Sequence, residues 1–337
     1  MSSKNAFNRL LRKGYPVDRC PYNSNDSLEA NEDLSLLAEV LNEVKDSNSK
    51  PAKFTINNVM ANPNFDKIKE SDFSKYYYEP FYKTLEADPK SDNVISIYRQ
   101  GLEEGVFTIQ FHGREHIHVN NWLAALNKKD RLFLDAFDEK MFTTHGGKHS
   151  SCRRECLDAM ATYSESDFKF VTEAVSDGLQ LFEETWGFKS KSLIAPCYTW
   201  SSSLEHYFLE NGIKFIQGGR VQKEPNAINE RFTLKRKYMG MKNKLLQFYF
   251  IRNVSFEPAE NLRKDWVSSA LKEIETAFFH RKPAIISSHR LNFIGRLNPE
   301  NRERNLELLK KLLSSIVKEW PEVEFMGSDD LGELVSN

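Results

Sequence analysis

The stretch Phe107-Thr-Ile-Gln-Phe-His112-Gly-Arg-Glu-His116 joins a strand-like run to two histidines four residues apart. The run before His112 is apolar, β-branched and aromatic, which favours a buried strand. If a helical turn begins at Gly113, the two imidazoles lie on one face, within reach of one metal ion. The alternative is a polar loop that holds two of the eight histidines. The segment predicts a strand that ends at a metal site.

Length and composition set the broad class of the protein. The chain has 337 residues, 40% of them hydrophobic, and a formal net charge of -1. No basic block points to nucleic acid, and no apolar run is long enough to cross a membrane. The start lacks the apolar core of a signal peptide, and four cysteines do not suggest a disulfide framework. We therefore expect a soluble, cytoplasmic protein whose oligomeric state the sequence leaves open.

Strand-like and helix-like segments alternate along the chain, which predicts an α/β fold with a parallel sheet, open or closed into a barrel. The expected strands are residues 54–60, 106–111, 192–195, 214–217, 245–254, 284–288 and 323–326. The expected helices are residues 2–13, 34–44, 119–126, 168–186, 266–279 and 306–320. Residues 217–229 are rich in Gly, Pro and Asn and are expected to form a long loop. No linker divides the chain, so a single domain over residues 1–337 is expected.

Polar and aromatic side chains follow most of the expected strands. They are found in Asn57-Asn58, at His112, in Ala195-Pro196-Cys197-Tyr198-Thr199-Trp200, in Arg252-Asn253 with Phe256-Glu257-Pro258 beyond, and in Ser287-Ser288-His289-Arg290-Leu291-Asn292. The carboxyl ends of parallel strands meet at one edge of a sheet, where ligands bind. If these ends converge, His112, His116 and His289 supply a metal centre and an acid/base.

Four motifs resemble, in order, those of the polysaccharide deacetylases, the family four carbohydrate esterases. His112-Gly-Arg-Glu-His116 is similar to the family's His-x-x-x-His metal motif. Ala195-Pro-Cys-Tyr198 stands where the family has Arg-x-Pro-Tyr, although the arginine is absent. Asp265-Trp266 is similar to the Asp-Trp wall motif, and Ser287-Ser-His289 resembles Leu-x-His. More closely, the chain resembles an uncharacterised bacterial subgroup. The resemblance implies a distorted (β/α) barrel of the deacetylase and glycoside hydrolase type, with about seven parallel strands visible.

The same resemblance implies a metal-dependent hydrolase that removes N- or O-acetyl groups from a poly- or oligosaccharide. His112 and His116 would bind a divalent metal, zinc being favoured over cobalt or nickel. His289 would be the catalytic acid, and Asp265 would orient it. Glu115 is a candidate base, with a salt bridge or the orientation of a ligand histidine as the alternative. The residues expected to line the carbohydrate site are Tyr198, Trp200, Trp266, Arg114, Arg290 and Asn292. The alternative is core packing for the aromatic residues and contacts between loops for Arg290 and Asn292.

The chain departs from the family at its start. The family's first strand ends in Asp-Asp, which supplies a metal ligand and the base, and we expect that strand to be missing here. Asp26 is a candidate substitute ligand, with an Asx turn or helix cap as the alternative. The other Asp-Asp, Asp329-Asp330, is expected in the first turn of a short helix. The alternative function is therefore an impaired barrel that binds glycan or serves polysaccharide biosynthesis.

Two further metal patterns compete with this interpretation. His112-x-x-Glu115-His116 also matches the inverted zincin pattern, which requires a long helix in place of the strand before His112. His145, His149, Cys152 and Cys156 have mixed nitrogen and sulfur ligands of the kind that suits structural zinc, with a glycine-containing loop as the alternative.

Overall fold

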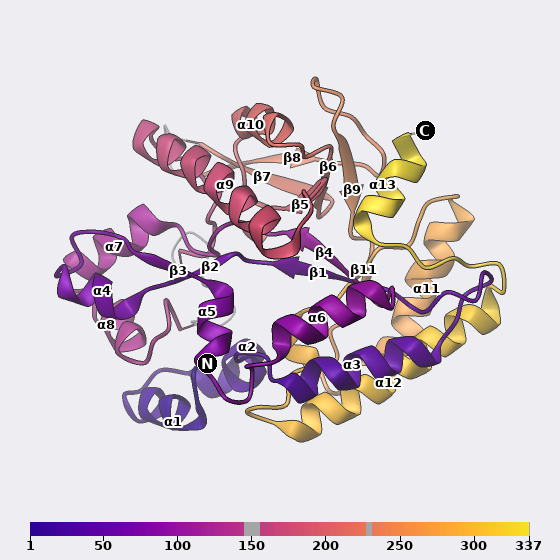
Figure 1. Ribbon diagram of the computed structural model, residues 1–337, viewed down its shortest axis with the longest axis horizontal. Helices are drawn as coiled ribbons and strands as arrows, with labels where there is room; N and C mark the ends of the chain where they lie inside the picture. The colour runs from indigo at the N-terminus through magenta and orange to yellow at the C-terminus, as the bar shows by residue number, and fades with distance from the viewer. Residues whose placement is uncertain (145–155, 227–230, 337) are drawn as a thin grey trace. The chain divides into compact units, whose positions relative to one another are not determined.

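The protein is an α/β structure, seen in a computed structural model that describes residues 1–144, 156–226 and 231–336 (Figure 1). Its main sheet has five strands in the order β1-β4-β5-β6-β9. They are β1 (Phe54–Asn58), β4 (Phe107–Phe111), β5 (Ser192–Ile194), β6 (Phe215–Gly218) and β9 (Phe248–Ile251). The pairs β4–β5, β5–β6 and β6–β9 are parallel, so their carboxyl ends point the same way.

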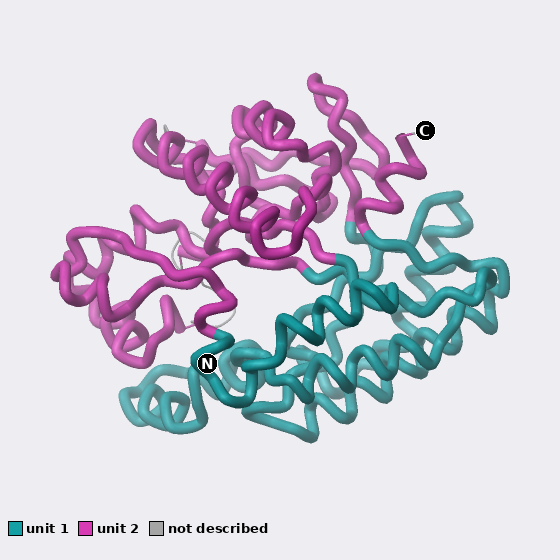
Figure 2. The backbone as a smooth tube through the Cα atoms, viewed as in Figure 1, with its two compact units in different colours: residues 1–56, 85–108, 252–327 teal, residues 57–84, 109–251, 328–337 magenta. Residues whose placement is uncertain are grey.

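The chain forms two compact units, each assembled from separate stretches (Figure 2). Unit 1 comprises residues 1–56, 85–108 and 252–327, and unit 2 comprises residues 57–84, 109–251 and 328–337. The boundary falls within β1 and within β4. Three non-contiguous stretches build each unit, so neither is an N- or C-terminal half.

Unit 1 is mainly helical. Its helices are α1 (Lys4–Arg12), α2 (Pro21–Asn25), α3 (Asn31–Glu43), α6 (Val94–Glu103), α11 (Trp266–Phe279) and α12 (Pro299–Glu319), with 3-10 turns η1 (Val17–Arg19) and η4 (Arg290–Asn292). Helix α12 packs against α3 and α11, and α3 packs against α6 (Figure 1). A separate parallel pair, β10 (Val254–Ser255) and β11 (Ile286–Ser287), completes the unit.

Unit 2 holds β5, β6 and β9 with the helices around them. They are α4 (Phe65–Glu70), α7 (Val119–Asn127), α8 (Arg131–Asp138), α9 (Glu165–Trp186), α10 (Glu205–Glu210) and α13 (Ser328–Ser336), with η2 (Pro196–Tyr198) and η3 (Ser202–Leu204). Helix α5 (Phe81–Glu86) crosses from unit 2 into unit 1. Antiparallel pairs join β2 (Ala61–Pro63) to β3 (Tyr78–Pro80) and β7 (Val221–Pro225) to β8 (Phe232–Arg236).

Helix α9 shows how local sequence sets the elements of unit 2. Ser164 caps its first turn, and Gly187 ends it in the left-handed conformation, with φ of 78°. The apolar face of the helix packs on the sheet, where the rings of Phe182 and Phe111 lie edge to face at 6.4 Å. Gly178 comes so close to Arg114 that a Cβ would lie 2.8 Å from its side chain, so only glycine allows this approach.

Four predicted strands coincide with β1, β4, β5 and β6, and all six predicted helices are present. The prediction of one strand over residues 245–254 is wrong, because β9 and β10 belong to different sheets. The side-chain amide of Asn253 lies at the break, where it accepts a hydrogen bond from Ile285 N and donates one to Pro283 O. Residues 284–288 contain the short strand β11.

Two other predictions of local structure are wrong. Residues 323–326 form no strand, because Val323 O and Phe325 N bond instead to Ser47 N and the Asp46 carboxylate. The expected loop after Gln217 contains strand β7. The Asp329-Asp330 prediction is confirmed, since both residues lie in the first turn of α13. The closed barrel stays a prediction. Within the described part of the chain, no helix has the length and apolar character needed to span a bilayer.

Candidate functional site

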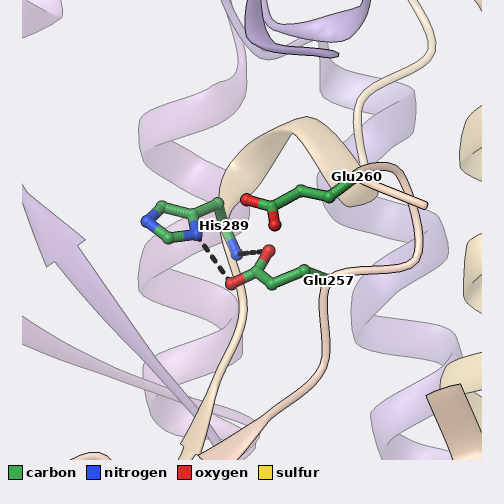
Figure 3. Close-up of side chains that lie close together, drawn as sticks. All are labelled: Glu257, Glu260 and His289. Carbon is green, nitrogen blue, oxygen red and sulfur yellow. Dashed lines mark hydrogen bonds and ion pairs between the residues drawn. The ribbon is translucent and has the colours of Figure 1, made fainter. Parts of the chain in front are cut away.

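The carboxyl ends of β10 and β11 bring three ionisable side chains of unit 1 together. The two strands are parallel neighbours, with Ser255 opposite Ser287. Glu257 and Glu260 follow β10, and His289 follows β11 (Figure 3). One ligand atom from each of the three side chains lies within 4.8 Å of the other two. This is the edge at which parallel α/β units carry their chemistry.

Glu257 fixes the orientation of His289. Its Oε1 lies 2.7 Å from His289 Nδ1, and its Oε2 accepts hydrogen bonds from His289 N at 3.0 Å and from Asn292 Nδ2 at 2.8 Å. The Glu257 side chain is only 5% exposed, whereas that of His289 is 45% exposed. A carboxylate only accepts hydrogen bonds, so Nδ1 carries the proton and Nε2 is the nitrogen available for chemistry.

Glu260 and Tyr22 complete the cluster. The ring of Tyr22, on α2, lies edge to face with the imidazole of His289 at 5.5 Å, and its hydroxyl is 3.5 Å from Glu260 Oε1. Burial, and then the nearby Glu257 carboxylate, raises the pKa of Glu260 above that of a free glutamate. Burial also raises the pKa of Tyr22, which therefore stays protonated. Glu260 is thus a carboxyl group that is readily protonated, beside an oriented imidazole.

Arg290 is engaged by acidic partners within unit 1. Its Nε lies 3.0 Å from Asp26 Oδ1, and its Nη1 lies 2.7 Å from Glu29 Oε2. Burial opposes ionisation of Asp26, but Arg290 outweighs it and holds the Asp26 pKa below its usual range. The predicted roles of Arg290 in substrate binding and of Asp26 as a metal ligand therefore give way to an ion pair that ties two segments together.

Asp265 does not contact His289 and instead caps α11. Its Oδ1 accepts a hydrogen bond from Ser268 N at 3.0 Å, and its Oδ2 accepts one from Ser268 Oγ at 2.7 Å. These bonds lower the pKa of Asp265. The residue that orients His289 is Glu257, which corrects the expectation for Asp265. Asn292 is fully buried and donates to Glu257, so it supports the cluster rather than lining a carbohydrate site.

The two tryptophans expected to stack on sugar are core residues. Trp266 is 7% exposed, and its Nε1 donates to Asn261 O at 2.9 Å. Trp200 is 1% exposed, and its Nε1 donates to Glu205 Oε1 at 3.1 Å. Because both indole rings are buried, neither is accessible for stacking on a sugar. Tyr198 is half-buried and left-handed, with φ of 55°, and stays an aromatic candidate for sugar contact.

His112 and His116 lie side by side in unit 2. Their ring centroids are 5.0 Å apart, as the spacing predicts, but residues 113–116 form a loop rather than the expected helical turn. Gly113 has φ of 104°, which a helix does not allow. His112 Nδ1 lies 2.6 Å from Ile194 O, so the backbone orients this ring as it orients many metal-ligating histidines.

The pair therefore fits two ligands of a metal ion. Among the described residues, no Asp, Glu, Cys or third His joins it in a group of three whose ligand atoms lie within 4.8 Å of one another. The inverted zincin pattern does not apply, because residues 113–116 form a loop and not a helix. His145, His149 and Cys152 lie outside the described residues. Burial raises the pKa of Cys156 to about 12, which disfavours the thiolate that a metal would need.

Glu115 forms an ion pair with Arg114, the residue that precedes it in the sequence. Its two oxygens each lie 2.7 Å from Arg114 nitrogens, and Arg114 also reaches Asp177 at 2.8 Å and covers the ring of Tyr78 at 4.4 Å. Glu115 is 3% exposed, and burial raises its pKa in spite of Arg114. With both oxygens engaged, Glu115 is not placed to act as the base, and Arg114 is not placed to bind substrate.

Glu257 was noted at the end of a predicted strand without a predicted role, and neither Glu260 nor Tyr22 was predicted to be a site residue. The available signal was the spacing Glu257-x-x-Glu260 directly after one strand, followed by His289 directly after the next. Tyr22 carried no such signal, because α2 precedes β10 by more than 200 residues.

Comparison with known proteins gives no family for the chain. No protein-family model matches it, and no curated protein matches it in sequence. Similar solved structures include the 4-alpha-glucanotransferase of Thermococcus litoralis, with a TM-score of 0.46 and 10% identity over 96% of this chain and 38% of that chain. A provisionally named polysaccharide deacetylase of Mycobacterium smegmatis has a TM-score of 0.43 and 10% identity, covering 98% of this chain and 86% of that chain.

A provisionally named glycoside hydrolase/deacetylase of Parabacteroides distasonis has a TM-score of 0.47 and 9% identity, covering 91% of this chain and 64% of that chain. The chain thus spans less than two thirds of the length of this protein and of the glucanotransferase. Similarity at this level, with TM-scores below 0.5, carries no argument about activity.

Proposed function

We propose that the protein is a hydrolase that removes acetyl groups from a carbohydrate, with His289 as the proton donor. The observation that carries the proposal is the bond of 2.7 Å between buried Glu257 and His289 at the carboxyl ends of two parallel strands. Glu257 holds the imidazole in one tautomer and stabilises its protonated form. Nε2–H then protonates the amine or alkoxide that leaves as the acetyl bond breaks.

Glu260 is the proposed general base. Its carboxylate takes a proton from the attacking water, and the resulting hydroxide adds to the acetyl carbonyl. A raised pKa suits this role, because the group then accepts a proton closer to neutral pH. His289 and Glu260 would thus form an acid and base pair, with Glu257 orienting the acid.

Metal binding in unit 2 is a separate part of the proposal. His112 and His116 would supply two ligands of one divalent ion. The orientation of His112 by Ile194 O supports this part. Metal content after purification without chelator, for the native chain and for the double variant His112→Ala/His116→Ala, tests it. About one equivalent of zinc more in the native chain than in the variant is the expected result.

Acetate release tests the proton donor. N-acetylated and O-acetylated oligosaccharides are incubated with the native protein, with His289→Gln and with His280→Gln. His280 is an exposed histidine at the end of α11, so its variant is a matched control. The native protein and the control should release acetate, and His289→Gln should be slower by roughly 100-fold or more. Equal rates for His289→Gln and the native protein would contradict the role of His289.

The alternative is a protein of the same fold that binds glycan without turnover. It is favoured by the ion pair of Glu115, whose two oxygens bond to Arg114 and so do not supply the base that was predicted beside His116. Glycan binding measured by calorimetry, with no acetate released from any acetylated oligosaccharide, would select this alternative.

A further inference from the structure

The Glu257, Glu260 and His289 side chains have the composition of a metal-binding triad as well as that of an acid and base pair. Figure 3 shows both carboxyl groups directed toward the side of the His289 ring that bears Nδ1, with Nε2 on the far side. Their ligand atoms lie within 4.8 Å of one another, a span that one ion can bridge. One nitrogen and two carboxylate oxygens form a donor set that divalent zinc, cobalt, nickel or manganese accepts.

The charge around the triad favours a cation. Two carboxylates face one imidazole, and within the described residues no lysine or arginine forms an ion pair with Glu257 or Glu260. Arg290, which follows His289 directly in the sequence, is committed to Asp26 and Glu29. A divalent ion would therefore relieve the repulsion between Glu257 and Glu260.

The two oxygens of Glu257 have different hydrogen-bond partners, which suits a carboxylate that binds a metal through one oxygen and is held in place through the other. Oε2 accepts from His289 N and Asn292 Nδ2, and these bonds can persist as supports for a ligating carboxylate. The described contacts of Oε1 consist of His289 Nδ1 alone. Displacement of the Nδ1 proton to solvent would turn both atoms into ligands of the same ion.

We propose that Glu257, Glu260 and His289 bind one divalent transition-metal ion, at a site distinct from the histidine pair of unit 2. Tetrahedral ligands about 2.1 Å from zinc lie about 3.4 Å apart, so Oε1 and Nδ1 must separate by roughly 0.7 Å from their present 2.7 Å. The exposed side chain of His289 can make this movement. Water fills the fourth position. The inference does not depend on hydrolysis of acetyl groups.

Zinc titration by calorimetry tests the site in a background that lacks the histidine pair. His112→Ala/His116→Ala should bind about one zinc ion, and adding Glu260→Gln should weaken binding at least roughly tenfold. Adding Glu275→Gln, which changes an exposed glutamate of α11, should leave binding unchanged. Binding enthalpies in buffers of different ionisation enthalpy should report release of about one proton. Equal zinc affinity with and without Glu260→Gln, or no binding in the background protein, overturns the proposal.

Anomalous diffraction from crystals of the background protein soaked in zinc locates the ion directly. Density between Glu260 and His289 supports the site, and zinc bound only to other surface carboxylates overturns it. Acetate release separates this inference from the proposed function. A protein that binds zinc here without releasing acetate overturns only the proposed function, and one that releases acetate but binds no zinc here overturns only the metal site.

Discussion

Glu257 in unit 1 and Glu115 in unit 2 are both buried glutamates, each near a histidine, yet they have different partners. Glu257 gives one oxygen to His289 and the other to backbone and amide N–H groups. Glu115 gives both oxygens to Arg114 in a bidentate ion pair. A buried carboxylate paired with a histidine adjusts a proton-transfer group, whereas one paired with an arginine holds the structure. The partner, rather than burial or the motif, decides the role.

Replacement of Glu257 should have the largest effect on activity. In Glu257→Gln the amide cannot accept all three N–H donors, so His289 loses its fixed tautomer and the stabilisation of its protonated form. We expect acetate release to fall roughly 100-fold or more, with Glu275→Gln as the matched control. Full activity in Glu257→Gln, measured at equal concentrations of folded protein, would remove the basis for comparing the two glutamates.

Replacement of Glu115 should affect stability instead. Glu115→Gln leaves Arg114 without its bidentate partner in a buried setting, where only Asp177 remains as a carboxylate neighbour. The free energy of unfolding should fall by about 3 kcal/mol, as measured by denaturant titration. Acetate release per folded molecule should not change. A selective loss of activity with unchanged stability would restore the role of base that the motif predicts for Glu115.

The elements of unit 2 that the sequence predicts are those with a strong local signal. Strand β4 is a run of apolar and β-branched residues, and α9 has a serine cap and a terminal glycine. Strands β7 and β8 were missed because their partly exposed residues, such as Lys223 and Lys235, lack the apolar alternation of a half-buried strand. The two strands form because each supplies the hydrogen-bond partners of the other, and not because their residues have a strong preference for extended structure.

For a related reason, the sequence predicted only part of the site in unit 1. His289 was found because it follows a strand directly, but its partner depends on the pairing of β10 with β11. The sequence merged β10 with β9, so Glu257 had no predicted neighbour 32 residues away. Asp265 was chosen from the family motif, whereas the Asp265–Ser268 spacing was a sufficient signal for a helix cap.

The pH dependence of stability should distinguish Glu260 from an ordinary surface glutamate. Its pKa in the folded protein is raised above the unfolded value of 4.5, so the folded state holds the proton more tightly. Stability should therefore decrease as pH rises from 4.5 through the folded pKa. Glu260→Gln should lack this decrease, so it should gain stability relative to the native protein toward neutral pH. Parallel denaturation curves of the two proteins from pH 4 to pH 7 would contradict the raised pKa.

The smallest effect is expected at Asp265, where a role as helix cap and a role in adjusting His289 predict different results. As a helix cap, Asp265 accepts two hydrogen bonds from Ser268, and Asp265→Ala should lower the melting temperature of α11 and hence of the protein by roughly 1–3 °C. The dependence of acetate release on pH should not move, because Asp265 does not touch His289. A shift of that profile in Asp265→Ala, at unchanged stability, would mean that Asp265 adjusts His289 as the deacetylase motif implies. Asp265→Asn should retain most of the cap, since asparagine is also a good N-cap residue, while it would lose any charge-dependent effect on His289. The two variants together therefore separate a hydrogen-bonding role from an electrostatic one.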